Sequence, residues 1–291
     1  MTQTPLAGAT LTDAAVLGLL ADRPAARARL ADLVDAGVPS VVLGVDRGDE
    51  GRIDPAVAAQ ALAALEPRLG VVVAADPTRD HPYNLARRLL SLDHLTAGRA
   101  GLALLARRPT GARASTTSWS AGIDDADTPE FARLVATLWS TFPRDALVGD
   151  QASGLFAHSE RIVRTDHHGR WSVDGPLNSP SSVQGLPPIL WFGDADDPES
   201  AERARDAGAD LVALETDLAG LPGSLAAGHT GVVVRLPTGT LPEAVERIAA
   251  LGLAGPSGTG STLRDLLGLP GRPVDTSGLE PAFAAPTEGH W

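Results

Sequence analysis

The chain has 291 residues, no cysteine and a formal net charge of −12, with 36 acidic against 24 basic side chains. This charge argues against nucleic-acid binding, which requires a basic face. The lack of cysteine excludes disulfides, thiolate metal sites and a cysteine nucleophile, and because every basic residue is arginine, Schiff-base chemistry on lysine is excluded as well.

The richness in arginine, alanine, glycine and proline is typical of a GC-rich genome and predicts an actinobacterial source. Residues 1–12 lack the basic and then apolar pattern of a signal peptide. No apolar run reaches the roughly 18 residues that a membrane span requires. We therefore expect a cytoplasmic protein that does not contact a membrane.

Short apolar runs alternate with amphipathic stretches along the chain, which predicts βα units around a parallel sheet. The predicted strands, in chain order, are Ala15–Leu20, Ser40–Asp46, Gly70–Ala75, Ala100–Ala106, Pro188–Phe192, Asp210–Glu215 and Gly231–Leu236. The predicted helices are Arg23–Ala36, Asp54–Leu65, Asn84–Leu95, Pro129–Phe142, Pro198–Ala207 and Pro242–Leu251.

We expect one domain over residues 1–291, because no linker-like segment interrupts this alternation. Residues 108–127 and 149–185 depart from the pattern and are predicted to be insertion loops, with a hairpin around Arg170–Val173. Residues 271–291 are rich in proline, glycine and alanine, which predicts an extended tail.

Three segments carry a resemblance to a known family. They are HPYNLARR and LDHLTAGRAG within residues 81–101, LWS through DHHG and GPLNSP to QG within residues 138–185, and STLRDLLGLP at residues 261–270. These segments resemble the luciferase-like flavin monooxygenases, in particular the branch that contains the nitrilotriacetate and dibenzothiophene-sulfone monooxygenases. The resemblance implies the α/β class and a (β/α) TIM-type barrel, and seven predicted strands suggest the loss of one βα unit of the usual eight.

The resemblance also implies a chemistry. Members of this family oxidise small organic molecules with FMNH2 and O2, so FMN is the expected cofactor and a flavin reductase the expected partner. A homodimer, or a heterodimer with another family member, is the expected assembly.

The resemblance places FMN at the C-terminal mouth of the barrel. The aligned cofactor-binding positions are Asp46, Ala74, Ala103, Gly193 and Ala195. Asp46 and Gly193 keep the residue type of the family. Alanine replaces polar family residues at the other three positions, so the polar groups that hold the flavin are largely substituted.

The helix after the fifth predicted strand begins among three carboxylates, Asp194, Asp196 and Asp197. In the family this helix end binds the FMN phosphate. A helix N-terminus attracts anions through its free N–H groups and its dipole, whereas carboxylates at that end repel them. We predict that an aspartate caps the helix where the phosphate would lie.

His81 is the candidate catalytic residue, because it precedes a helix on the mouth side of the barrel. The seven histidines show no metal-ligand spacing, so no metal site is predicted. Two functions remain open. The chain is either an FMN-dependent monooxygenase with an altered cofactor site, or a non-catalytic paralogue or partner subunit that does not bind FMN.

Overall fold

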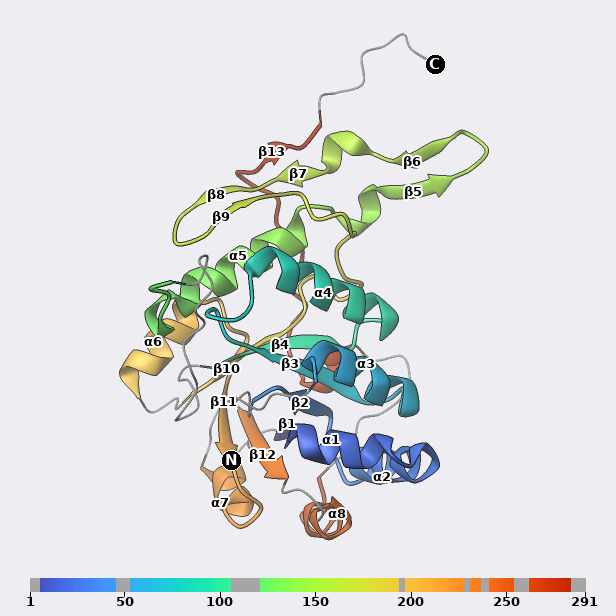
Figure 1. Cartoon of the computed structure of the whole chain (residues 1–291), viewed down its shortest axis with the longest axis vertical. Helices are drawn as coiled ribbons and strands as arrows, with labels where there is room; N and C mark the ends of the chain where they lie inside the picture. The colour runs from blue at the N-terminus through green and yellow to red at the C-terminus, as the bar shows by residue number, and fades with distance from the viewer. Residues whose placement is uncertain are drawn as a thin grey trace.

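A closed barrel of seven parallel strands forms the centre of the molecule, in the order β1–β12–β11–β10–β4–β3–β2 (Figure 1). The structure is a computed structural model that describes residues 6–45, 53–105, 121–193, 197–227, 231–236, 241–253 and 262–283. The barrel strands are β1 (Leu6–Leu11), β2 (Ser40–Leu43), β3 (Gly70–Ala75), β4 (Ala100–Leu105), β10 (Ile189–Phe192), β11 (Leu211–Thr216) and β12 (Gly231–Leu236). The predicted seven-stranded TIM-type barrel is confirmed.

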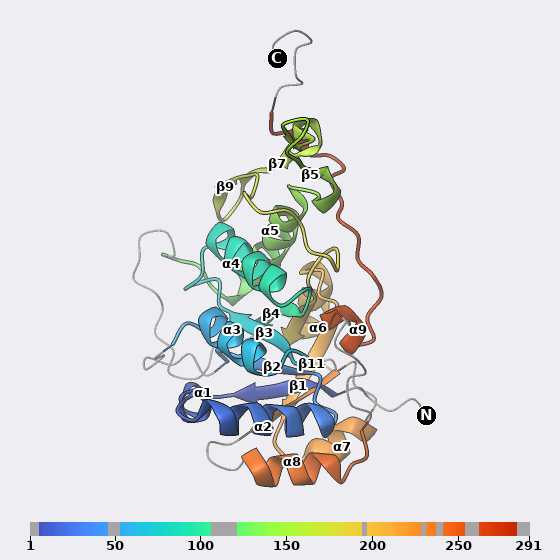
Figure 2. The ribbon, with the colours of Figure 1, turned by 90° about the vertical axis from the view of Figure 1, so that its right-hand side faces the viewer.

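Helices follow the strands and cover the outside of the barrel (Figures 1 and 2). They are α1 (Asp13–Leu20), α2 (Arg23–Asp35), α3 (Pro55–Leu65), α4 (Pro82–Leu95), α5 (Thr128–Ser140), α6 (Pro198–Asp206), α7 (Leu221–Ala226), α8 (Leu241–Ala249) and α9 (Leu263–Leu266). No helix in these described ranges is long and apolar enough to cross a bilayer.

The first barrel strand lies earlier than the sequence predicted. Residues 15–20 belong to α1, which begins where the Thr12 hydroxyl accepts a hydrogen bond from the Ala15 N–H at 3.1 Å. The strand is instead Leu6–Leu11, rich in alanine and glycine. A Cβ on Gly8 would lie 2.5 Å from the Ser40 hydroxyl of β2, so the close approach of β2 requires a residue of poor strand propensity there.

Leucine from the third resemblance segment closes the N-terminal end of the barrel. Leu263 and Leu267 join the cluster of inward-facing side chains. A Cβ on Gly70 or Gly101 would lie 2.6 or 2.7 Å from a methyl group of Leu263. These two glycines therefore admit Leu263 into the barrel, and the segment has a packing role.

The three resemblance segments meet at this same end of the barrel. Gln184 Nε2 donates to Asp93 Oδ1 at 2.7 Å and to the Ala100 carbonyl at 3.0 Å. The Arg264 backbone N–H donates to Gln184 Oε1 at 3.3 Å, and its Nη2 donates to Asp210 Oδ1 at 2.9 Å. Because Asp93, Gln184 and Arg264 are all buried, these contacts join the segments into one buried scaffold.

Residues 147–174 form a layer outside α4 and α5, which lie between this layer and the barrel (Figure 2). The layer contains the hairpin β5 (Leu147–Asp150) and β6 (Leu155–Ala157), and the hairpin β8 (Asp166–His168) and β9 (Ser172–Asp174). Strand β7 (Val163–Arg164) pairs with β13 (Glu280–Pro281) from the end of the described chain. The predicted hairpin around Arg170–Val173 is therefore present as β8–β9.

Candidate active site

Two predicted cofactor positions meet inside the barrel. Ala74 on β3 and Ala103 on β4 are register partners, and both are buried within the inward-facing cluster that also holds Phe192, Ala213 and Val233. Alanine side chains offer no hydrogen bond, so this part of the barrel interior presents only apolar contact.

A polar group lies on the opposite side of the barrel, near its C-terminal end. Val233 and Ala213 face inward, and side chains two residues apart on a strand share a face, so Arg235 and Glu215 face inward as well. Thr10 Oγ1 donates to Glu215 Oε1 at 2.9 Å, and Arg235 Nη2 forms an ion pair with Glu215 Oε2. We call Thr10, Glu215 and Arg235 the mouth triad.

The mouth triad was missed by sequence reasoning. Thr10 belongs to the strand that was predicted elsewhere, Glu215 was treated only as a strand terminus, and Arg235 only as a residue within a predicted strand. A usable signal was present, because each charged residue is the penultimate residue of a mostly apolar parallel strand. Active sites of TIM barrels lie at this C-terminal end, so charges there indicate ligand contact.

The turn after β3 satisfies its own polar groups. Asp76 Oδ1 accepts from the Thr78 N–H at 2.8 Å and from its hydroxyl at 2.7 Å. Arg88 forms ion pairs with Asp80 and with Asp54, the N-cap of α3. These carboxylates hold the turn and the start of α3 and α4 in place.

His81 lies directly after this turn, at the N-cap position of α4. It is half-buried, and burial lowers the pKa of its imidazole because desolvation disfavours the charged form. The lowered pKa favours the neutral ring at pH 7, and a neutral imidazole has one donor and one acceptor nitrogen.

Gly193 follows β10, at the position where the resemblance to the family places the FMN phosphate. A Cβ there would lie 2.3 Å from the Ser200 hydroxyl and 2.9 Å from Trp191 Nε1, and Trp191 Nε1 donates to Ser200 Oγ at 3.1 Å. The glycine is thus required by side-chain packing around Trp191 and Ser200.

The N-terminus of α6 carries the predicted aspartate cap. Asp197 Oδ1 accepts from the Glu199 N–H at 3.2 Å, and Pro198 has no N–H to offer. Glu199 adds a second carboxylate in the first turn. The carboxylates at this helix end therefore oppose the binding of a phosphate dianion.

Asp46 and Ala195, the remaining predicted cofactor positions, lie outside the described residues. So do residues 106–120, most of the first predicted insertion loop. Over the ranges that are described, no group of three or more His, Asp and Glu side chains is arranged to hold a metal ion.

The chain belongs to the luciferase-like monooxygenase family, whose profile matches residues 7–220. It is 32% identical over 195 residues to a pristinamycin IIA synthase subunit of Streptomyces pristinaespiralis, and the match covers 65% of this chain and 61% of that protein. It is 36% identical over 159 residues to dibenzothiophene-sulfone monooxygenase of Rhodococcus erythropolis, over 52% of this chain and 34% of that one. The family predicted from the three segments is confirmed, and the relatives include a member of the named branch.

The fold has a solved counterpart in EDTA monooxygenase of Chelativorans sp. BNC1. The TM-score is 0.63 at 18% identity, with 88% of this chain and 93% of that chain covered. The match with the two curated relatives spans only 61% and 34% of their own lengths.

Proposed function

We propose that this chain is the luciferase-like component of a flavin-dependent monooxygenase system, in which FMNH2 from a separate flavin reductase and O2 oxidise a small organic substrate. Family membership supports the reaction class. The observation that carries the proposal for this chain is the inward-facing pair of Glu215 and Arg235, hydrogen-bonded to Thr10 at the barrel mouth. A cytoplasmic location suits a protein that depends on a reductase.

Bound flavin would supply the oxygen chemistry, and the protein would supply binding and orientation. The mouth triad provides a hydroxyl, a carboxylate and a guanidinium on one side of the barrel, suited to the polar groups of a substrate. Ala74 and Ala103 provide an apolar surface on another side. His81, whose lowered pKa favours the neutral ring at pH 7, is the proposed proton acceptor near the mouth.

Oxygen consumption tests this proposal. The purified chain is combined with a flavin reductase, NADH and FMN, and candidate substrates are screened for oxygen uptake above the reductase background. Substrate-dependent uptake that falls in Glu215→Gln and Arg235→Gln, while both variants keep wild-type thermal stability, is the expected result. Uptake equal in wild type and both variants contradicts a role for the mouth triad.

A second candidate function is that of a partner subunit that binds no FMN itself. The carboxylates of Asp197 and Glu199 at the α6 N-terminus favour it, as does the similarity to a protein named as a synthase subunit. Co-expression with a longer luciferase-like monooxygenase from the same genome tests it. A stable heterodimer in which only the longer chain carries flavin supports this function, and flavin bound to this chain contradicts it.

A further inference from the structure

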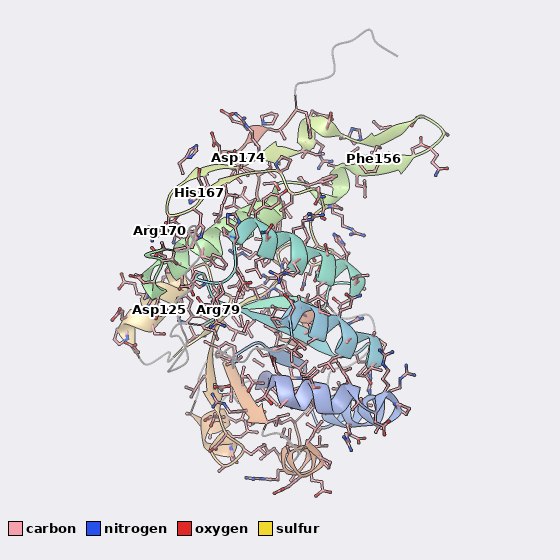
Figure 3. The ribbon with its side chains drawn as sticks, in the orientation of Figure 1. Arg79, Asp125, Phe156, His167, Arg170 and Asp174 are labelled. Carbon is pink, nitrogen blue, oxygen red and sulfur yellow. The ribbon has the colours of Figure 1, made fainter. Side chains whose placement is uncertain are left out.

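The turn between β3 and α4 places an arginine at the mouth of the barrel. Directly after β3, the Asp76 carbonyl accepts the N–H groups of Arg79 and Asp80, each at 2.9 Å. These bonds close the turn, so Arg79 stays at the C-terminal end of the strands (Figure 3), where the active sites of TIM barrels lie. Strands β4 and β10 separate β3 from β11 on one side, and β2 and β1 separate it from β12 on the other. Arg79 therefore lies across the mouth from the mouth triad.

The Arg79 side chain is half-buried but has no protein partner. Within the part of the chain that the structure describes, no carboxylate or carbonyl accepts a hydrogen bond from its guanidinium. Charged side chains that lose contact with water normally have a partner. The other buried or half-buried arginines in the described ranges follow this rule, and they are Arg68, Arg88, Arg99, Arg203, Arg264 and Arg272. The exception at position 79 indicates that the partner is a bound molecule.

The carboxylates nearest to Arg79 along the chain are already occupied. Asp76 Oδ1 accepts from the Thr78 N–H and from its hydroxyl. Asp80 Oδ2 accepts from the Asp76 N–H at 3.3 Å, and Asp80 Oδ1 pairs with Arg88 at 3.4 Å. Because Asp80 pairs with Arg88, the turn leaves the positive charge of Arg79 uncompensated.

This uncompensated charge distinguishes Arg79 from the other charged groups described at the mouth. Arg235 forms an ion pair with Glu215, so the mouth triad has no net charge. Helix α6 begins with the carboxylates of Asp197 and Glu199, which repel anions. Of these groups, Arg79 is the one that attracts an anion. Its guanidinium presents N–H groups as a planar fork, which matches the oxygens of a carboxylate, sulfonate or phosphate.

We infer that Arg79 binds an anionic group of the substrate. This inference rests on the proposed function, because it assigns a role at the same barrel mouth. Ala74 and Ala103 line the barrel wall on this side and offer only apolar contact. A ligand that fits both features has an apolar body and a carboxylate, sulfonate or phosphate group. The phosphate of FMN has the same chemistry, so the test must separate it from an anion on the substrate.

Three ligands that share one ring test the site on the purified chain without flavin. They are benzoate, phenyl phosphate and the neutral benzamide, and NMR titration gives their dissociation constants. The wild type is expected to bind both anions about tenfold more tightly than benzamide. Arg79→Gln should remove this preference, and Arg79→Lys should keep most of it. Arg87→Gln is the matched control and should keep the preference, because it loses the same charge from an exposed position on α4.

Three results overturn the inference. They are anions that bind no better than benzamide, a preference that survives in Arg79→Gln, and an equal loss of preference in Arg87→Gln. Melting temperatures of the variants show whether each of them is folded.

Flavin titration separates the two sources of the anion. Arg79→Gln is expected to bind FMN and riboflavin as the wild type does, and benzoate to bind the FMN-saturated wild type. A loss of affinity for FMN but not for riboflavin in Arg79→Gln assigns Arg79 to the flavin phosphate and overturns its role in substrate binding. Benzoate binding that depends on Arg79 in a chain that binds no flavin supports the anion site and contradicts the proposed function.

Discussion

Gln184 Nε2 donates to Asp93 Oδ1 over 2.7 Å in the interior of the protein. The two residues belong to different resemblance segments, 91 positions apart, and Arg264 from the third segment donates to Gln184 in turn. Parts of all three segments that identify the family therefore build the base of the barrel, opposite its mouth. Their preservation explains the fold and carries no information about the cofactor.

Gln184→Ala is expected to lower the free energy of unfolding by about 1–3 kcal/mol, because it leaves the buried Asp93 carboxyl short of a donor. Chemical denaturation measures this loss. Gln151→Ala is the matched control, since Gln151 is exposed in the β5–β6 turn, and should change stability little. Equal stability of the two variants contradicts the scaffold role of Gln184.

Asp93 is expected to make stability depend on pH. Burial raises the pKa of Asp93 above its ordinary 3.8, outweighing the hydrogen bonds from Ser182, Ala100 and Gln184. The folded state therefore favours the protonated form, so the contribution is fully present below 3.8 and is lost as pH rises through the raised pKa. In Asp93→Asn this loss is absent. Melting temperatures measured against pH should fall less steeply for the variant, and parallel curves contradict the expectation.

The barrel was largely predictable because most of its strands are short and buried on both faces. Gly70–Ala75 and Gly231–Leu236 are continuous apolar runs, which is the pattern of a covered parallel strand. The strand Leu6–Leu11 was not predicted from the sequence, because its close contact with Ser40 requires glycine at position 8. Such a requirement comes from a distant strand and leaves no local pattern in the sequence.

The site was less predictable than the scaffold. The family resemblance identified Ala74 and Ala103 as cofactor-binding positions, and the two are register partners inside the barrel. An alanine side chain gives no sign of the polar residue that it replaces in the family. Thr10 lies 205 positions before Glu215 in the chain, and the pairing of β1 with β12 brings it next to Glu215 and Arg235. Pairing of that kind is set by the closed barrel as a whole.

Glu130 should hold the β8–β9 hairpin on α5 in a pH-dependent way. Burial alone would raise its pKa, but hydrogen bonds from His167 and the Arg170 N–H lower it below the ordinary 4.5 (Figure 3). This contribution is present above 4.5 and is lost as pH falls through the depressed pKa. The protection factors for hydrogen exchange in β8 and β9, which correct for the intrinsic pH dependence of exchange, should therefore fall at acid pH.

Glu130→Gln should show the faster exchange already at neutral pH. Glu160→Gln is its control, because Glu160 also pairs with a histidine, His158 at 3.3 Å, but is half-exposed on another turn. Unchanged exchange in Glu130→Gln would show that apolar packing, such as that of Trp171 on Phe131, suffices to hold the hairpin.

Asp197→Asn is expected to strengthen FMN binding. Asparagine caps a helix as well as aspartate does, so α6 should remain intact while one negative charge is removed from its N-terminus. At an intermediate dielectric this charge is worth about 1 kcal/mol, or roughly fivefold in affinity. Riboflavin is the control ligand, because it lacks the phosphate. An equal change for both flavins contradicts repulsion of the phosphate by Asp197.

Flavin titration of the purified wild-type chain is the most direct measurement. FMN is added in air and FMNH2 under anaerobic conditions, with flavin fluorescence and the melting temperature as readouts. We predict saturable binding of both forms, with quenched fluorescence for FMN and a raised melting temperature for FMNH2. A melting temperature and a fluorescence signal that stay unchanged at large flavin excess would contradict the assignment as a flavin-binding monooxygenase component.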